Sequence, residues 1–230
     1  MAALHRGLAA HQAGDAAAAE ALYREVLALQ PTQADALYLL ATLRLAQLQS
    51  GEAVALRKRA LAAQPGVTLA QQTLGDALET GGDGPGAIAA YRAALALNPA
   101  LAEAQFRLGR LLFDRRETEA AATCFRTAAA LRPGDAGTRN NLAIALQTLG
   151  DVAGAVAEYR RALALRPDAA DIHTNLGCSL LTLNDWAGAV ASHRRALALR
   201  PGYPAALTNL ASALGPTAPD EAIGCYRQAL

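Results

Sequence analysis

Few side chains in this chain of 230 residues are of the types that bind metal ions or carry out covalent catalysis. The candidates are three cysteines and four histidines, which are scattered along the sequence: Cys124, Cys178, Cys225, His5, His11, His173 and His193. Zinc sites use cysteine and histidine ligands in closely spaced pairs, and this spacing does not occur here. No combination of serine, histidine and acid stands out either. We therefore expect no catalytic residue, no metal site and no cofactor.

Asparagines offer a different chemistry, because one carboxamide both donates and accepts hydrogen bonds. Asn141, Asn175 and Asn209 recur at intervals of 34 residues. Carboxamides stacked at this interval would bind successive backbone amides of an extended peptide without reading its sequence. The alternative is that these asparagines are ordinary structural residues that bond neighbouring helices. The sequence leaves both interpretations open.

Two arginines form a second candidate contact, this time for a carboxylate or a phosphate. Arg107 and Arg110 lie three residues apart, which places them on one face of a predicted helix. We expect this face to lie against Asn140 and Asn141. The alternative is that the arginines pair with acids of their own helix, such as Glu103.

The charge balance argues against a polyanionic partner. The chain has 21 basic and 20 acidic residues, interspersed along the sequence, and a net charge of +1. A nucleic-acid-binding protein shows a basic stripe, so we expect a protein or peptide partner and no nucleic acid. The start of the chain lacks a basic leader, and no apolar run reaches 18 residues. These features predict a cytoplasmic protein without membrane insertion, and the heavy use of alanine and arginine suggests a bacterial source.

The elements that must position these side chains are indicated by a regular spacing of prolines. Six prolines recur every 34 residues: Pro31, Pro65, Pro99, Pro133, Pro167 and Pro201. A period of this length indicates a solenoid of stacked units and not a single globular core. We predict one array over residues 1–230, with units at 1–33, 34–67, 68–101, 102–135, 136–169, 170–203 and an incomplete 204–230.

Each unit reads as two helices separated by a turn. The residues are 53% hydrophobic and 4% aromatic, with abundant alanine and leucine that favour helices. If the proline is position 32 of its unit, position 8 is glycine or alanine and position 20 is alanine, so two helices can approach closely. Pairs such as Gly14-Asp15 and Gly150-Asp151 mark the turn, because glycine ends one helix in the left-handed conformation and aspartate caps the next. Proline then stops the second helix.

Small residues at positions 8 and 20, an aromatic residue at 24, alanine at 27 and proline at 32 resemble the tetratricopeptide repeat over essentially the whole chain. The resemblance implies an all-α fold, a right-handed α-solenoid of about seven helix-turn-helix units. Arg57 and His193 depart from the pattern by replacing the aromatic residue at position 24. In four repeats, position 4 is polar instead of large and apolar, as Gln71, Gln105, Arg139 and His173. Runs such as Tyr-Arg-Arg-Ala-Leu-Ala-Leu-Arg-Pro are also similar to the repeat arrays of O-GlcNAc-transferase-like, SPINDLY-like and sulfotransferase-fused proteins.

The resemblance further implies that the first helix of each unit lines a concave groove through positions 2, 5, 6, 9, 12 and 13. From these positions we predict a peptide-binding surface of twelve residues, hereafter the groove residues: Tyr38, Gln72, Asp76, Phe106, Arg107, Arg110, Asn140, Asn141, Thr174, Asn175, Thr208 and Asn209. The predicted function is a non-catalytic scaffold that binds an extended peptide or a partner helix. The alternative is a substrate-recognition segment of a larger transferase whose catalytic domain lies outside these residues.

The last predicted helix carries an apolar stripe that includes Ile223, Tyr226 and Leu230, with no polar capping helix after it. Terminal units of solenoids need a polar outer face. Three explanations compete: the chain is excised from a longer protein, it forms a homo-oligomer through this end, or the apolar face is tolerated. We favour the first, with self-association of the isolated chain as its consequence.

Overall fold

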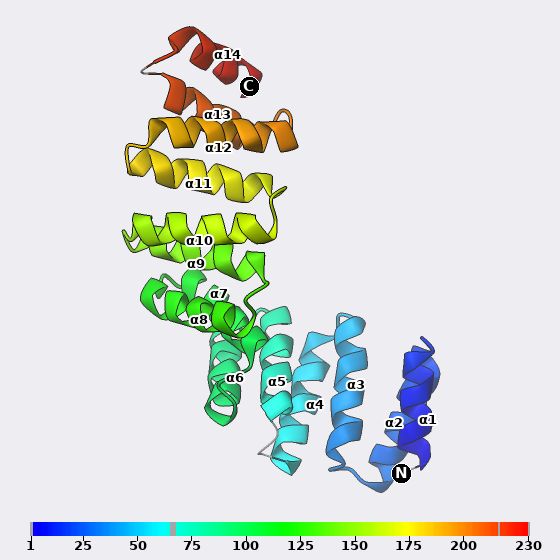
Figure 1. The fold of residues 1–230 in the computed structure, drawn as a ribbon. Coiled ribbons are helices and arrows are strands. Elements are labelled where there is room, and N and C mark those ends of the chain that lie inside the picture. Colours follow the sequence, from blue (N-terminus) through cyan, green and yellow to red (C-terminus); the bar gives the residue numbers. More distant parts are fainter. Residues whose placement is uncertain (1, 65–67, 216, 230) are drawn as a thin grey trace. The chain divides into compact units, whose positions relative to one another are not determined.

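A computed structural model describes residues 2–64, 68–215 and 217–229. These residues form fourteen α-helices and no strand (Figure 1). The odd-numbered helices are α1 (Ala2–Gln12), α3 (Ala34–Ala46), α5 (Thr68–Thr80), α7 (Ala102–Asp114), α9 (Ala136–Thr148), α11 (Ala170–Thr182) and α13 (Pro204–Leu214). The even-numbered helices are α2 (Ala16–Leu29), α4 (Ser50–Ala63), α6 (Gly84–Leu97), α8 (Thr118–Leu131), α10 (Val152–Leu165), α12 (Trp186–Leu199) and α14 (Pro219–Ala229).

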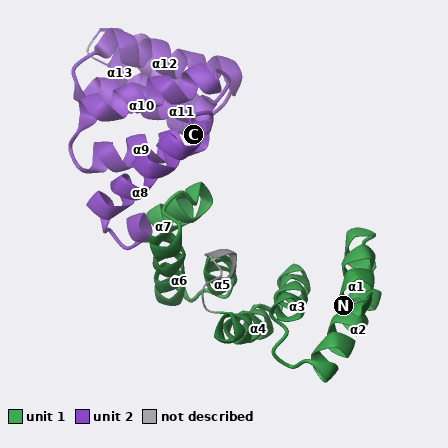
Figure 2. Ribbon diagram, turned by 60° about the horizontal axis from the view of Figure 1, so that its bottom comes forward, with its two compact units in different colours: residues 1–111 green, residues 112–230 purple. Residues whose placement is uncertain are grey.

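The chain divides into two compact units, unit 1 over Met1–Leu111 and unit 2 over Leu112–Leu230 (Figure 2). Within each unit, helices that follow one another in the sequence pack side by side, as α3 does on α4 and α9 does on α10. The predicted all-α fold of helix-turn-helix repeats is confirmed. None of the helices, as far as the structure describes them, is long and apolar enough to cross a membrane.

The turns inside the helix pairs have the chemistry expected from the sequence. Gly14, Gly82 and Gly150 have φ angles of 82°, 80° and 86°, in the left-handed region that glycine adopts without strain. The aspartate that follows each glycine caps the second helix: Asp15 accepts a hydrogen bond of 2.9 Å from the backbone N–H of Ala18. The same cap begins three other second helices, at Asp83, Asp151 and Asp185.

Two further turns reach the left-handed conformation with ordinary side chains. Leu48 has a φ angle of 60° and Arg116 one of 63°, which costs each residue about 1 kcal/mol relative to a right-handed conformation. The cap residues that follow, Gln49 and Glu117, make no side-chain hydrogen bond to the helix. These two turns therefore depend on the packing of the helices that they join and not on local turn chemistry.

A side chain of the second helix fills a slot against the small residue at position 8 of the first helix. Four aromatic rings in this slot are at most 2% exposed: Tyr23, Tyr91, Phe125 and Tyr159. A Cβ atom on Gly75 would lie 2.6 Å from a ring carbon of Tyr91, so the absence of a side chain permits the close approach. His193 fills the slot in the pair α11 and α12 and is fully buried. The slot thus accepts an imidazole in place of the usual ring.

The polar residues at position 4 also have a structural role. Nε2 of Gln105 donates a hydrogen bond of 3.4 Å to the carbonyl oxygen of Pro99, six residues before it. Arg139 donates to the carbonyl of Pro133 and His173 donates to that of Pro167, at distances of 3.1 and 3.0 Å respectively. These bonds satisfy carbonyl groups just after the end of the preceding helix, which would otherwise need water. The departure from the repeat pattern at position 4 therefore secures the connection between successive pairs.

Candidate functional site

The groove residues all lie on first helices, from α3 to α13. Eleven of them are partly or fully exposed. Thr174 differs, because it is 4% exposed and its hydroxyl donates a hydrogen bond of 2.9 Å to the carbonyl of Ala170. Its side chain therefore offers no free surface to a ligand.

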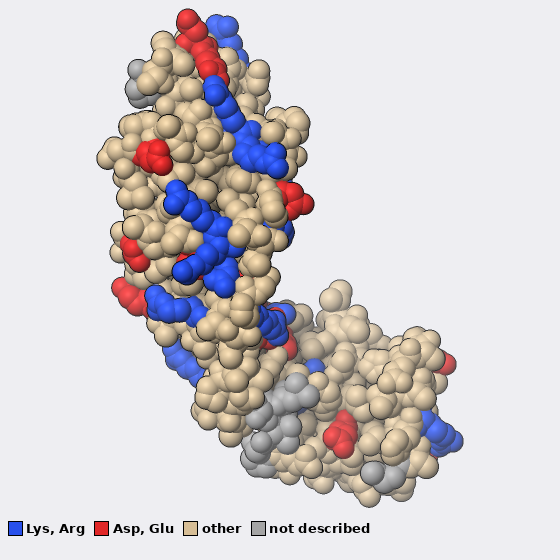
Figure 3. Space-filling model, in the orientation of Figure 1, with Lys and Arg blue, Asp and Glu red and all other residues tan. Residues whose placement is uncertain are grey.

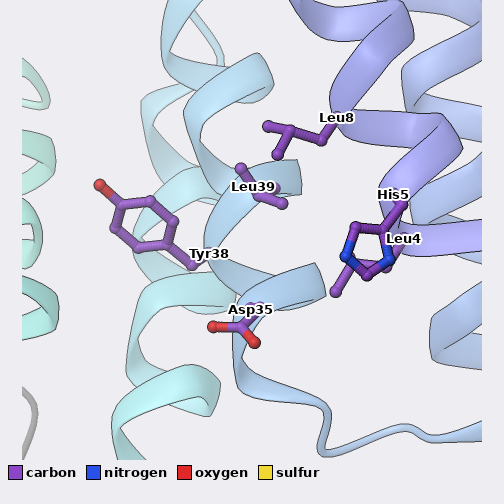
Figure 4. A pocket seen from close by; sticks show the side chains of 6 residues that line it. All are labelled: Leu4, His5, Leu8, Asp35, Tyr38 and Leu39. Carbon is purple, nitrogen blue, oxygen red and sulfur yellow. The ribbon is translucent and has the colours of Figure 1, made fainter. Parts of the chain in front are cut away.

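In unit 1, a hollow of about 260 Å³ separates α1 from α3. It is lined by Leu4, His5 and Leu8 of α1 and by Asp35, Tyr38 and Leu39 of α3 (Figure 4). The α1 residues occupy positions 5, 6 and 9 of their repeat, the same groove positions that identified Tyr38. Applying the repeat numbering to the first repeat would have found them. Three leucines make this the most apolar part of the groove face in unit 1.

Behind Tyr38, a buried arginine reaches the groove face from the second helix. Figure 4 shows the Tyr38 ring pointing away from α1. The Cζ atom of Arg57 lies 4.9 Å from the centroid of this ring, within the range of a cation–π contact. Nη2 of Arg57 also donates a hydrogen bond of 3.3 Å to Oγ1 of Thr42. Arg57 is 3% exposed, and its burial lowers the pKa of the guanidinium.

Further along unit 1, charged groove residues form a closed network over α5, α6 and α7. The Tyr91 hydroxyl oxygen lies 2.7 Å from a carboxylate oxygen of Asp76 and 2.9 Å from one of Glu79, so its single proton is shared between the two acids. Arg107 pairs with Glu79 at 3.4 Å and Arg110 pairs with the same carboxylate at 3.3 Å. Burial, together with the two carboxylates, raises the pKa of the Tyr91 hydroxyl, so it remains a donor at neutral pH.

Arg107 does pair with an acid of its own helix, since its Nε lies 2.9 Å from a carboxylate oxygen of Glu103. Burial alone would lower the pKa of Arg107, but the bond to Glu103 and the charge of Asp76 outweigh it and raise the pKa. The pairing with Glu79 was not predicted, although the sequence places Glu79 at a groove position of the preceding repeat. The contact of Arg107 and Arg110 with the asparagines of the next repeat stays a prediction.

In unit 2 the predicted groove residues are four carboxamides and two hydroxyls. Nδ2 of Asn175 donates a hydrogen bond of 3.3 Å to Oδ1 of Asn140, which joins α11 to α9. Nδ2 of Asn209 lies 3.1 Å from Sγ of Cys178, which joins α13 to α11. The carboxamides therefore do bond neighbouring helices, as the alternative interpretation expected. Each of these bonds uses one N–H of a group that has two donors and an acceptor, so peptide binding by the remaining atoms is compatible with it.

The end of unit 2 exposes two large apolar side chains. Ile223 is 48% exposed and Tyr226 is 44% exposed, whereas Ala222 and Cys225 of the same helix face α13 and are buried. The Tyr226 hydroxyl lies 3.2 Å from the hydroxyl of Ser212. Leu230, the third residue of the predicted self-association surface, lies outside the described residues. Self-association through this surface stays a prediction.

The described residues contain no cluster of three or more His, Cys, Asp or Glu side chains that could hold a metal ion. Burial raises the pKa of the Cys178 and Cys225 thiols, which makes both poor nucleophiles at neutral pH.

Models of the tetratricopeptide repeat match residues 2–33, 38–102, 73–136, 140–204 and 174–214. Together these matches cover most of the sequence. The chain belongs to the tetratricopeptide repeat family. Tetratricopeptide arrays are protein-interaction scaffolds, and their fold is typically non-catalytic.

Solved structures of other tetratricopeptide proteins are similar to this chain. A crystal structure of MamA protein is 26% identical with a TM-score of 0.67, and the match covers 71% of this chain and 90% of that one. YrrB, described as a TPR protein with an unusual peptide-binding site, is 18% identical with a TM-score of 0.75, covering 80% and 95%. The C-terminal part of a repeat protein from Cytophaga hutchinsonii is 14% identical with a TM-score of 0.78, covering 99% and 94%. No match was found among the curated proteins.

Proposed function

We propose that this tetratricopeptide array is a non-catalytic scaffold whose groove face in unit 2 binds the backbone of an extended peptide. The observation that carries the proposal is the series of half-buried carboxamides on successive first helices, Asn140 and Asn141 on α9, Asn175 on α11 and Asn209 on α13. The hydrogen bonds between Asn140 and Asn175 and between Asn209 and Cys178 hold these groups in place before any ligand arrives. Fixing them in advance reduces the entropy lost on binding.

The chemistry of unit 2 favours a peptide backbone over a charged ligand. An extended backbone presents N–H and C=O groups in alternation, and carboxamides complement both. The groove positions of α9, α11 and α13 named in the predicted surface carry no charged side chain. In unit 1, by contrast, the charges of α5 and α7 are already paired with one another. The hollow between α1 and α3 would accept an apolar side chain as a separate binding feature.

A binding experiment tests this proposal with one matched pair of threonine variants and one asparagine variant. Peptides would be selected from a phage-displayed library of random dodecapeptides, and their affinity for each variant measured by fluorescence anisotropy. Thr208→Ala removes an exposed hydroxyl from the groove face of α13, and Thr123→Ala removes one from the second helix α8. Asn141→Ala removes a carboxamide whose contact to Asn140 is a long one, at 3.5 Å.

We expect Asn141→Ala to weaken peptide binding by about tenfold, as the loss of one or two hydrogen bonds to the backbone would. Thr208→Ala should cause a smaller loss, and Thr123→Ala should cause none. Helicity and thermal melting should stay unchanged in all three, because none of these residues makes the hydrogen bonds that join α9 to α11 and α11 to α13. Equal affinities for the groove variants and the unaltered chain would place the binding site elsewhere and overturn the proposal.

A further inference from the structure

Three second helices of unit 2, α8, α10 and α12, carry exposed arginines at two or three shared repeat positions. These residues, hereafter the arginine row, are Arg126 and Arg132 of α8, Arg160, Arg161 and Arg166 of α10, and Arg194, Arg195 and Arg200 of α12, each set including the residue just after its helix. All eight side chains are exposed. Figure 3 shows a run of basic side chains over unit 2, with acidic side chains mainly at its margins. On this face, basic and acidic residues that are interspersed along the sequence are thus separated by the fold.

The segregation has a local cause in the helices themselves. The arginines lie in the last turns and at the C-caps of α8, α10 and α12, where the helix dipole favours positive charge. Asp135 is an acid close to the row, because the charge of Arg132 helps to lower its pKa. Asp151 and Asp185, by contrast, lie at the opposite ends of α10 and α12, at the N-caps. Because a helix separates the two groups, most of the row lies far from these carboxylates.

Some charges of the row are compensated within unit 2. Arg161 forms an ion pair with Glu158, and Arg194 pairs with Glu221 at 2.7 Å. The Cζ atom of Arg200 lies 4.7 Å from the ring centroid of Tyr203. The charge of Arg132 also acts on Asp135, whose pKa it helps to lower. Glu158, Glu221 and Asp135 offset part of the charge of the eight arginines, so the row keeps an excess of positive charge.

The repeat fold does not require these arginines. In unit 1 the same three positions hold a mixed set: Arg24, Glu25, Gln30, Lys58, Arg59, Gln64, Arg92, Ala93 and Asn98. Gln30 and Gln64 end their helices with the same backbone bond that Arg132 makes, from the cap N–H to a carbonyl four residues before it. Helix termination therefore does not account for arginine in unit 2.

We propose that the arginine row binds an acidic segment of a partner protein. Guanidinium groups bind carboxylates through two parallel hydrogen bonds, a geometry that lysine does not offer. Rows of arginine on three successive second helices would contact carboxylates spaced along such a segment.

A protein segment fits the surroundings of the row better than a nucleic acid does. The net charge of the whole chain is +1, which gives little long-range attraction for a polyanion. Glu158 and Glu221 lie beside the row and would repel a continuous line of phosphates. A polypeptide with separated carboxylates avoids these two acids. The surface is distinct from the groove face, since it lies on second helices.

The test uses the whole chain and a fluorescein-labelled dodecapeptide of alternating Glu and Ser, with a Gln-for-Glu peptide as its neutral counterpart. A triple variant of unit 2 combines Arg132→Gln, Arg166→Gln and Arg200→Gln. It places glutamine at the repeat position where unit 1 carries Gln30 and Gln64. A control variant, Arg6→Gln, Lys58→Gln, Arg92→Gln, removes the same charge from exposed positions of unit 1. Affinities are measured by anisotropy at low and at moderate salt, and melting temperatures confirm that both variants fold.

We expect the Glu peptide to bind and the Gln peptide not to bind, with affinity falling as salt increases. The unit 2 variant should bind the Glu peptide about tenfold more weakly, whereas the unit 1 control should bind it as the unaltered chain does. Equal weakening by both variants would attribute binding to net charge and overturn the proposal. Tighter binding of oligothymidylate of equal charge, or of phosphatidylserine vesicles, would overturn it in favour of a nucleic acid or a membrane. Absence of binding to the Glu peptide would also overturn it.

Discussion

Unit 1 and unit 2 are built from the same helix-turn-helix repeat but use their arginines differently. In unit 1, Arg44 and Arg57 are buried between helices and Arg107 is held in a network of carboxylates. In unit 2, the arginine row lies on the surface and the groove face is uncharged at the positions predicted to bind a ligand. The comparison teaches that the repeat fixes which positions are buried and which are exposed. It does not fix whether a charged residue occupies a buried or an exposed position. We expect the buried charges of unit 1 to affect stability and the exposed charges of unit 2 to affect binding.

Substitution of Arg44, which forms a buried ion pair in unit 1, should have the largest effect on stability. Arg44 of α3 is 5% exposed and its guanidinium lies 2.9 Å from Glu20 of α2 and 2.8 Å from Glu52 of α4. The hydrogen bond from Arg44 lowers the pKa of Glu20. One side chain thus links three helices.

We expect Arg44→Met to lower the free energy of unfolding by about 3 kcal/mol, because the carboxylate of Glu20 loses a buried partner. Urea denaturation followed by circular dichroism measures the change. The matched control is Arg126→Met in the arginine row, which should change stability by less than about 0.5 kcal/mol. Similar effects of the two substitutions would remove the distinction between the units.

In unit 2, the buried side chain of His193 should make the stability depend on pH. His193 is fully buried, its two ring nitrogens have no hydrogen-bond partner among the described residues, and burial lowers its pKa to about 4. The unfolded chain would bind a proton near pH 6.5 whereas the folded chain would not. Stability is therefore complete above about pH 6.5 and falls as the pH decreases towards 4.

Between pH 6.5 and pH 4 we expect the free energy of unfolding to fall by about 3 kcal/mol, because the pKa of His193 is 6.5 in the unfolded chain and about 4 in the folded chain. Thermal melting at a series of pH values measures the loss. His193→Phe, which places in the slot the kind of ring that Phe125 provides in another repeat, should remove this component of the pH dependence. A pH dependence that is unchanged in His193→Phe would show that other groups cause it.

The smallest effect expected is a gain in stability. Nε and Nη1 of Arg57 have no hydrogen-bond partner within the described part of the chain, although both atoms are buried. Tyr159 holds the slot position in the repeat whose position 8 is Ala143, and Ala41 is position 8 in the repeat of Arg57. Arg57→Tyr would therefore give this repeat the same pair of residues, tyrosine and alanine. We expect the free energy of unfolding to rise by about 1 kcal/mol, since an aromatic ring replaces a buried guanidinium that has two unsatisfied nitrogens. A loss of stability in urea denaturation would mean that the contact with Tyr38 is worth more than the missing hydrogen bonds.

Much of the fold was predictable because its signals are local in sequence. Gly14, Gly82 and Gly150 adopt the left-handed conformation that the turn requires, and the following aspartates cap the next helix. The turns at Leu48 and Arg116 have the same conformation without a glycine, so their residue types gave no signal. These two turns were predictable only from the 34-residue period of the repeat.

The candidate site was predictable in part. Repeat numbering placed the groove residues on first helices, but it also selected Thr174, whose hydroxyl faces its own helix backbone. Of the two acids that pair with Arg107, the sequence suggested Glu103 of the same helix as an alternative partner but did not predict Glu79 of the preceding repeat. The structure gives Arg107 both, at 2.9 and 3.4 Å. Such pairings depend on side-chain conformations across helices, which no local pattern encodes.

The sequence by itself determined the repeat, its helices, its turns and the residues that fill the slot, because each depends on residues at fixed short intervals. Only the tertiary structure decided where charge is buried, which carboxamides bond one another, and that arginines spaced along the chain gather on the second helices of unit 2. The physical reason is that stacking brings together residues one repeat apart, so surfaces arise from equivalent positions and not from neighbours in sequence.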